Sequence, residues 1–112
     1  MDGKRNFEIL ILKPAQDFLN SLDKNIKRKI DINMANAQKE NDTRLFKKLS
    51  GSDIWEFRTK FQSMEYRLLA FWDKTQNKLV VVSNGFVKKS QKTPEKEIKK
   101  AEQIMKLYYK QK

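Results

Sequence analysis

The chain has 112 residues, with 25 Lys and Arg against 14 Asp and Glu, so its formal net charge is +11, and it contains neither histidine nor cysteine. Without cysteine there is no disulfide framework and no thiolate nucleophile, and the lack of both residue types argues against a zinc site. The length and the 38% of hydrophobic residues suit a single domain spanning residues 1–112 with a modest core.

The N-terminal stretch and the distribution of charge bear on localisation and partners. Residues 1–6 form no apolar signal segment, and no apolar run approaches the length of a membrane span. We therefore expect a soluble cytoplasmic protein that has no membrane partner. Residues 88–112 hold nine Lys against three Glu, and such a basic excess favours a polyanionic partner.

The first half of the chain predicts one strand and then a helical hairpin. Phe7–Leu12 is almost continuously apolar, which indicates a strand buried on both faces. Pro14 cannot continue a central strand but suits a helix start. Ser21–Asp23 interrupts the helical pattern that follows, so the second arm is expected to start near Asp23. The apolar stripe of the two arms comprises Ala15, Phe18, Leu19, Leu22, Ile26, Ile30, Met34 and Ala37.

The middle of the chain predicts an antiparallel meander. A turn at Asn41–Thr43 and a loop at Ser50–Asp53 precede segments in which apolar and polar residues alternate. Because strands that follow one another closely pair as hairpins, three consecutive strands are expected to lie side by side. The predicted strands are Ile54–Phe61, Glu65–Trp72 and Lys78–Phe86.

A C-terminal helix is expected over Pro94–Tyr109, with Thr93 as its N-cap and Pro94 at its first position. A disordered basic tail is the alternative, and helical spacing of apolar residues disfavours it. The whole order of elements predicts an α+β fold in which helices cover one face of the sheet and leave the other free. Arg58, Lys60 and Arg67 would lie on that free face.

The segment Gly85–Pro94 is a candidate anion site. It leaves the most apolar run of the chain, brings in Lys88, Lys89 and Lys92, and then opens the last helix. Cationic side chains and the unpaired N–H groups of a helix start both attract anions. With so basic a chain, a nucleic-acid phosphate is the expected anion.

Four motifs in order resemble one protein family. They are Leu49–Gly51, Ile54–Arg58 (Ile-Trp-Glu-Phe-Arg), Tyr66–Trp72 (Tyr-Arg-Leu-Leu-Ala-Phe-Trp) and Asn84–Pro94, which ends in Lys-Thr-Pro. This pattern resembles the HigB branch of the RelE/ParE toxin superfamily, over roughly residues 6–110. The resemblance implies a RelE-like fold and a toxin of a bacterial type II toxin–antitoxin system.

The same resemblance implies an activity and two partners. Such toxins are similar to ribosome-dependent endoribonucleases that cut mRNA in the ribosomal A site and inhibit translation, and a helix-turn-helix antitoxin holds them inactive. Two alternatives stay open. Some members with this fold inhibit DNA gyrase without cutting RNA, and a basic RNA-binding module that does no damage would have the same composition.

If the protein cuts RNA without a metal, a cofactor or a histidine, only a few kinds of side chain can carry out the reaction. Such a site must take a proton from the 2′-OH, stabilise the charged phosphorane and protonate the leaving oxygen. Arg58 and Arg67 are the candidates to clamp the phosphate. One of Lys88, Lys89 and Lys92 is the candidate for proton transfer, because surrounding cations favour the neutral form of a lysine.

Further RNA contacts are predicted at Lys47, Lys48, Lys60 and Phe86. For Lys47 and Lys48 the competing interpretation is a solvated surface. For Phe86 the choice lies between stacking on a base and packing in the core.

Overall fold

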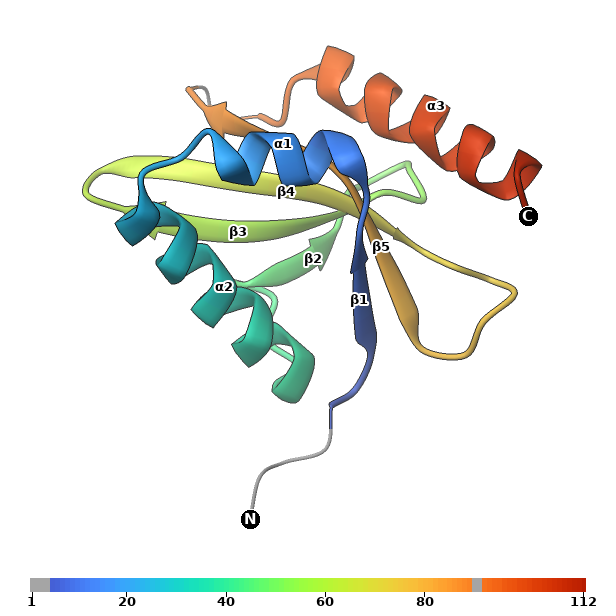
Figure 1. The fold of residues 1–112 in the computed structure, drawn as a ribbon, viewed down its shortest axis with the longest axis horizontal. Helices are drawn as coiled ribbons and strands as arrows, with labels where there is room; N and C mark the ends of the chain where they lie inside the picture. The colour runs from blue at the N-terminus through green and yellow to red at the C-terminus, as the bar shows by residue number, and fades with distance from the viewer. Residues whose placement is uncertain (1–4, 90–91) are drawn as a thin grey trace.

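A computed structural model describes residues 5–89 and 92–112 of the protein. The described chain forms a five-stranded sheet and three helices, with its N- and C-terminal ends at separate places on the surface (Figure 1). The strands are β1 (Glu8–Ile11), β2 (Phe46–Lys48), β3 (Trp55–Phe61), β4 (Met64–Trp72) and β5 (Leu79–Lys88), and the helices are α1 (Lys13–Asn20), α2 (Lys24–Lys39) and α3 (Glu95–Lys110). No helix in these two ranges is long and apolar enough to cross a membrane.

The strand order is β1-β5-β4-β3-β2, with β1 parallel to β5 and all other neighbours antiparallel. The predicted meander and the α+β class are therefore confirmed. Strand β2 was not predicted. It has three residues, too few to show alternation, and its extended form depends on pairing with β3, where Phe46 lies opposite Phe57.

The first strand differs from the prediction in its burial. Ile9 and Ile11 pack against the core, whereas Leu10 on the other face is 40% exposed. The predicted burial of both faces is wrong because α3, the helix on the Leu10 face, packs mainly on β4 and β5 and not on the edge strand β1.

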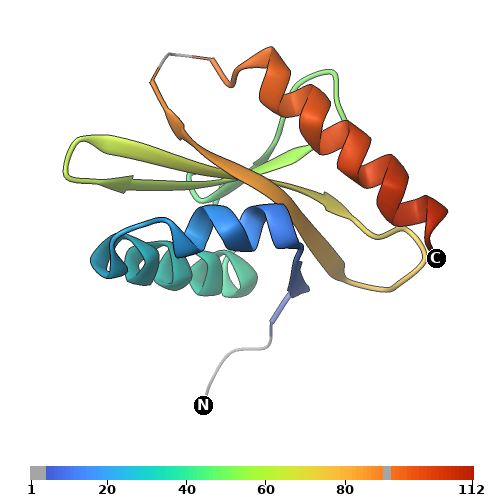
Figure 2. The ribbon, with the colours of Figure 1, turned by 45° about the horizontal axis from the view of Figure 1, so that its top comes forward.

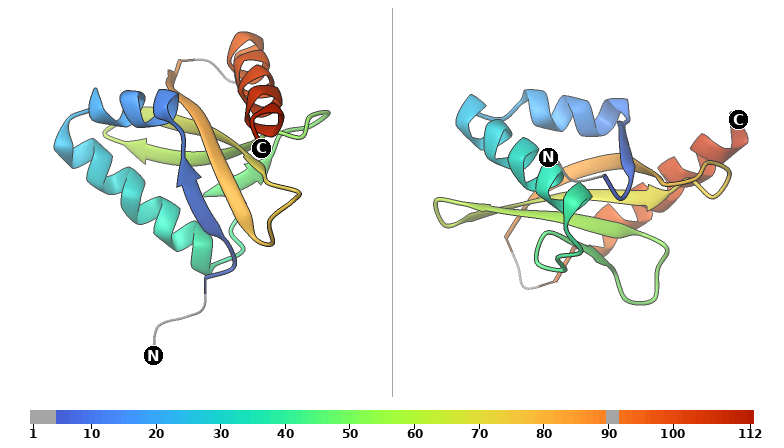
Figure 3. Two further views of the ribbon diagram at one scale, coloured as in Figure 1. Left: turned by 45° about the vertical axis from the view of Figure 1, so that its right-hand side comes forward. Right: turned by 90° about the horizontal axis from the view of Figure 1, so that it is seen from below.

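The helical hairpin forms as predicted. Pro14 stands in the first turn of α1, and the Asp23 side chain caps α2 by accepting a hydrogen bond from the Asn25 N–H at 3.1 Å. Both helices lie on one face of the sheet (Figure 3). Beneath them is a buried cluster that includes Leu19, Ile30, Met34, Phe57, Leu68, Val80 and Val82.

Helix α3 lies across the opposite face of the sheet (Figure 2). Its Ala101 is fully buried against Leu69, Phe71 and Val81 in a second apolar cluster. The expectation that one face is free is therefore wrong for the part of the sheet under α3. The hairpin end of β3 and β4 extends beyond this helix and is left uncovered by it (Figure 1).

Gly85 permits a close approach of α1 to the sheet. A Cβ atom at this position would lie 2.4 Å from Cδ2 of Phe18 and 2.7 Å from Cδ2 of Leu68. Any larger residue would push α1 away from β5, so the glycine that opens the predicted anion segment has a packing role.

Candidate functional site

A hollow of about 590 Å³ lies at the hairpin end of β3 and β4. Its lining contains six basic side chains and one carboxylate, that of Glu65, so its potential is positive. The lining residues are Lys29, Asn33, Arg44, Leu45, Arg58, Thr59, Lys60, Glu65, Arg67 and Lys88.

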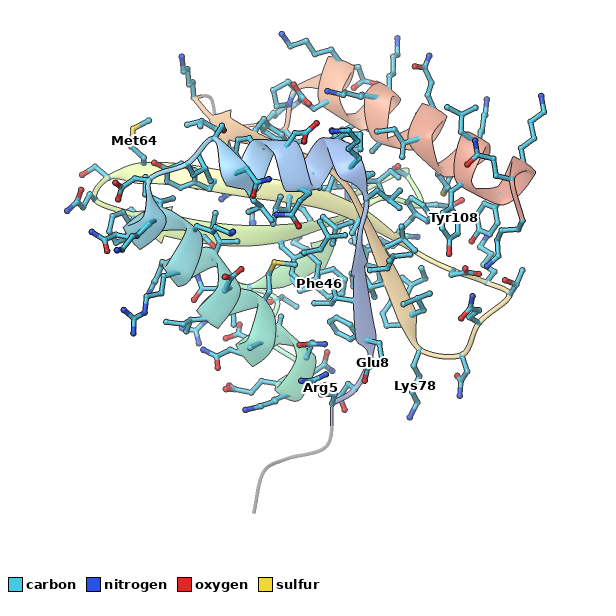
Figure 4. All side chains as sticks on the ribbon, viewed as in Figure 1. Arg5, Glu8, Phe46, Met64, Lys78 and Tyr108 are labelled. Carbon is cyan, nitrogen blue, oxygen red and sulfur yellow. The ribbon has the colours of Figure 1, made fainter. Side chains whose placement is uncertain are left out.

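The strand register explains why charged residues gather there. Arg58 of β3 lies directly opposite Arg67 of β4. Glu65 of β4 lies opposite Lys60 on one side and opposite Lys88 of β5 on the other. Because side chains alternate between faces, these five residues share the face that carries α3, just beyond the reach of that helix. Met64 marks the turn where this part of the sheet ends (Figure 4).

A buried carboxylate compensates the two facing arginines, since like charges directly opposite each other destabilise a sheet. Nε of Arg58 donates to Oε1 of Glu56 at 3.2 Å. Nε of Arg67 lies 3.4 Å from the same oxygen, and it makes no hydrogen bond of normal geometry to any residue that the structure describes. Glu56 is only 1% exposed, so it faces these cations without competition from bulk water.

A second carboxylate holds Arg67 from the solvent side. The Glu65 side chain is 42% exposed, and its Oε1 accepts a hydrogen bond from Nη2 of Arg67. This hydrogen bond lowers the pKa of Glu65, and the nearby charges of Lys88 and Lys60 lower it further. Arg67 is thus buried between one inner and one outer carboxylate, and only the outer one is free to move into water.

Thr93 does not cap α3, which corrects the prediction. Its hydroxyl donates to Oε2 of Glu56 at 2.5 Å, so it is not available for the helix N-terminus. The N-cap is Pro94, whose carbonyl accepts from the N–H groups of Glu97 and Ile98. The bond from Thr93 therefore ties the residue just before Pro94 and α3 to the arginine pair.

The three predicted lysines divide into two groups. Lys88, the last residue of β5, lines the hollow with Arg58 and Arg67. Lys89 and Lys92 are exposed on the segment that leads to α3 and are not among the lining residues. Residues 90–91 of the predicted anion segment lie outside the described residues.

The predicted RNA contacts also lie in different places. Lys60 lines the hollow. Lys47 and Lys48 are exposed on β2 and line a different hollow of about 600 Å³, whose lining includes four aromatic side chains. Phe86 is 8% exposed and packs beneath α3, so packing rather than base stacking is its observed role.

Several residues of the site were not predicted. Lys29 comes from α2 on the other face of the sheet and Arg44 from the loop before β2, so the hollow continues around the edge of β3 beyond its pairing with β2. No local pattern in the sequence links these two residues to the strands. Glu56 did carry a signal, because it stands two residues before Arg58 and therefore on the same face of β3. Its importance appears only once its burial and its three partners are known.

Comparisons with known proteins agree with this architecture. The family whose model matches is Phage derived protein Gp49-like (DUF891), over residues 17–106. No curated protein sequence matches the chain. A mutant of the E. coli toxin RelE in the free state is similar in structure, with a TM-score of 0.62 and 16% identity over 88% of this chain and 96% of the RelE chain.

Two toxin–antitoxin complexes contain similar chains. The match to the RelBE2 complex from Mycobacterium tuberculosis has a TM-score of 0.55 and 20% identity, and it covers 78% of this chain and 98% of the matched chain. The match to the intact E. coli RelBE complex has a TM-score of 0.55 and 17% identity, and it covers 77% of this chain and 99% of the matched chain.

At such identities a structural likeness shows the fold, so the RelE-like architecture is confirmed, while the assignment to the HigB branch stays a prediction. The family match extends over most of the sequence. The chain therefore belongs to the Phage derived protein Gp49-like family and has the fold of the RelE toxins.

Proposed function

We propose that the chain is the toxin of a type II toxin–antitoxin system and an endoribonuclease that cuts translated mRNA on the ribosome. The observation that carries this proposal is the convergence of six basic side chains on one hollow. These side chains come from α2, from the loop before β2 and from three strands, so a rigid scaffold holds them in place. A fixed cationic hollow suits the phosphate backbone of RNA better than a mobile basic tail does.

The proposed chemistry assigns separate tasks to arginine and lysine. Arg58 and Arg67 stabilise the negative charge that develops on the phosphorane, with Arg67 becoming accessible when Glu65 moves aside. Lys88, or Lys89 or Lys92 on the following segment, transfers the proton. The reaction requires no histidine, and no metal or other cofactor is part of the proposed mechanism.

Dependence on the ribosome has a physical reason. A cluster of cations holds phosphates but does not place the 2′-OH in line with the scissile bond. A ribosome that presents the message in that geometry supplies the orientation, which lowers the barrier by roughly several kcal/mol. mRNA in the ribosomal A site is therefore the proposed substrate.

A cognate antitoxin is the second proposed partner. Two of the similar chains belong to toxin–antitoxin complexes, which supports this assignment. The helix-turn-helix type of that antitoxin follows from the family resemblance alone.

Primer extension tests the proposed activity. Purified protein added to ribosomes that hold a defined message is expected to create new cleavage ends, and the same message without ribosomes is expected to be cut far more slowly. Arg58→Ala should abolish the new ends, whereas Arg28→Ala, at an exposed position of α2, should not. Intact messages together with double-strand breaks in gyrase-treated DNA would refute the proposal in favour of gyrase inhibition.

A further inference from the structure

The structure assigns a positioning role to Glu56, an inference that rests on the proposed function of the hollow. One carboxylate contacts three groups from three parts of the chain. Its Oε1 contacts the guanidinium groups of Arg58 and Arg67, and its Oε2 accepts from the Thr93 hydroxyl. We propose that Glu56 sets the orientation of both arginines and holds Thr93, the residue after Lys92, beside them.

The burial of Glu56 separates it from an ordinary surface ion pair. Surface pairs contribute little because water screens them and their side chains move. Glu56 is 1% exposed and the Arg67 side chain is 5% exposed, so their charges interact through a poorly polarisable surrounding. If one partner moved away, a buried charge would be left uncompensated. Because an uncompensated buried charge is strongly destabilising, the two side chains stay in place.

The geometry also explains how the two arginines differ. Arg58 donates to Glu56 through Nε and keeps 31% of its side chain exposed. An arginine anchored through Nε leaves its two terminal nitrogens for a bidentate contact with phosphate. Arg67 is held behind it by the buried Glu56 and by the exposed Glu65.

Thr93 brings a third part of the chain to the same carboxylate. Its bond to Glu56 is made across 37 positions of sequence and joins β3 to the segment that precedes α3. Lys92 is the neighbouring residue along the chain, so this bond holds the residue next to that candidate proton carrier. Glu56 therefore links the candidate phosphate clamps to one of the candidate proton carriers.

A Glu56→Gln variant distinguishes the orientation of the arginines by Glu56 from the effect of its negative charge on RNA binding. The substitution removes one negative charge, so electrostatics alone predicts tighter RNA binding and no loss of cleavage. A positioning role predicts that the cleavage rate on ribosome-bound message falls about 100-fold, as for misplaced catalytic groups, while RNA binding is unchanged or tighter. The matched control is Glu8→Gln on β1, at the opposite edge of the sheet, which should keep the wild-type cleavage rate.

Thr93→Val is the second variant, because loss of a buried charge can unfold a protein whereas this change leaves every charge in place. It should lower the cleavage rate about tenfold and leave the affinity for a single-stranded RNA oligonucleotide unchanged, since small misplacements act on orientation. Wild-type cleavage rates in folded Glu56→Gln and Thr93→Val proteins would overturn the positioning role. Parallel loss of binding and cleavage in Thr93→Val would also overturn it.

Arginine side-chain NMR gives a readout that does not depend on cleavage. The Nε–H signal of Arg58, which donates to Glu56, should be shifted and protected from exchange in the wild-type protein and should move toward the free-arginine value in Glu56→Gln. The chemical shift of the Arg67 Nε–H, which lies 3.4 Å from the same carboxylate oxygen, should change as well. Unchanged signals would refute the inference. If the wild-type protein cuts no message but these signals respond as expected, the proposed function fails while the positioning of the arginines by Glu56 stands.

Discussion

Glu65 is the residue whose removal should open the hollow to phosphate. Its exposed carboxylate faces Arg67, Lys88 and Lys60, so it occupies the position that an RNA phosphate would take. Because a phosphate must compete with this carboxylate, Glu65→Gln should raise the affinity for a single-stranded RNA oligonucleotide. Water screens the exposed carboxylate of this ion pair, so the pair is worth roughly 1 kcal/mol, which corresponds to about a fivefold change in Kd.

Fluorescence anisotropy with a labelled oligonucleotide measures this change. Glu8→Gln alters the net charge by the same amount at the far edge of the sheet and serves as the control. Equal gains in affinity from both variants would mean that only the total charge matters, and that Glu65 does not compete with phosphate.

The sequence predicts some of these residues because strand alternation is a local property. Arg58, Lys60 and Arg67 were expected on one face, and the register places them there. Lys29 and Arg44 join them only through the packing of α2 and the loop before β2, which no short window of sequence encodes. For Thr93 the local sequence predicted a role that the fold does not use. Its hydroxyl could cap α3 but instead donates a tertiary hydrogen bond to Glu56.

At the scale of elements, the end of α3 is fastened to the sheet by a polar cluster. Asp73, just after β4, is 3% exposed and accepts from the Tyr108 hydroxyl at 2.5 Å and from Nζ of Lys112 at 2.6 Å. The Tyr109 hydroxyl donates to the carbonyl oxygen of Trp72 at 2.8 Å. Tyr108 points from α3 toward the loop after β4 (Figure 4). These bonds hold the C-terminal turn of the helix against the sheet.

Asp73→Asn should therefore weaken the packing of α3 on the sheet. It should also make the free energy of unfolding less dependent on pH in the acid range. Burial would raise the pKa of Asp73, but hydrogen bonds from Lys112, Thr75 and Tyr108 lower it below its ordinary value. The unfolded chain then binds the proton more tightly, so the contribution of Asp73 to stability is complete above the unfolded pKa of about 3.9 and is lost progressively below it. At neutral pH the substitution should cost about 1–3 kcal/mol of unfolding free energy.

Urea denaturation at pH 7 and at pH 3 measures both effects. Asp31→Asn, at an exposed position of α2, is the control and should leave the unfolding free energy nearly unchanged. The difference between Asp73→Asn and the wild type should shrink at pH 3. A difference of the same size at both pH values would show that the charge of Asp73 does not contribute.

The helices and the long strands could be predicted because their signals are local. Pro14 and Asp23 define helix starts by backbone chemistry, and α1 and α2 begin beside them. The expectation of a free face failed although a signal was present. In β4, Leu69 and Phe71 alternate with Leu68 and Ala70, and such a continuous apolar run indicates a strand covered on both faces.

At the scale of the whole molecule, the net charge of +11 has two separable effects. Cations spread over the surface attract RNA from a distance, and salt screens this attraction beyond a Debye length of about 8 Å. Cations in the hollow would instead contact phosphates directly and release condensed counterions. The two effects differ in how binding responds to salt when a single lysine is removed.

Lys88→Ala should change this salt response, whereas Lys106→Ala should not. Lys88 lines the hollow beside Arg67, and Lys106 is exposed on α3 outside it. If Lys88 contacts one phosphate, its removal should reduce the slope of log Kobs against log salt concentration by about 0.7, the value for single-stranded nucleic acids. Anisotropy titrations with an RNA oligonucleotide at several salt concentrations give both slopes. Equal slopes for the two variants would mean that Lys88 contacts no phosphate and attracts RNA only as part of the diffuse surface charge.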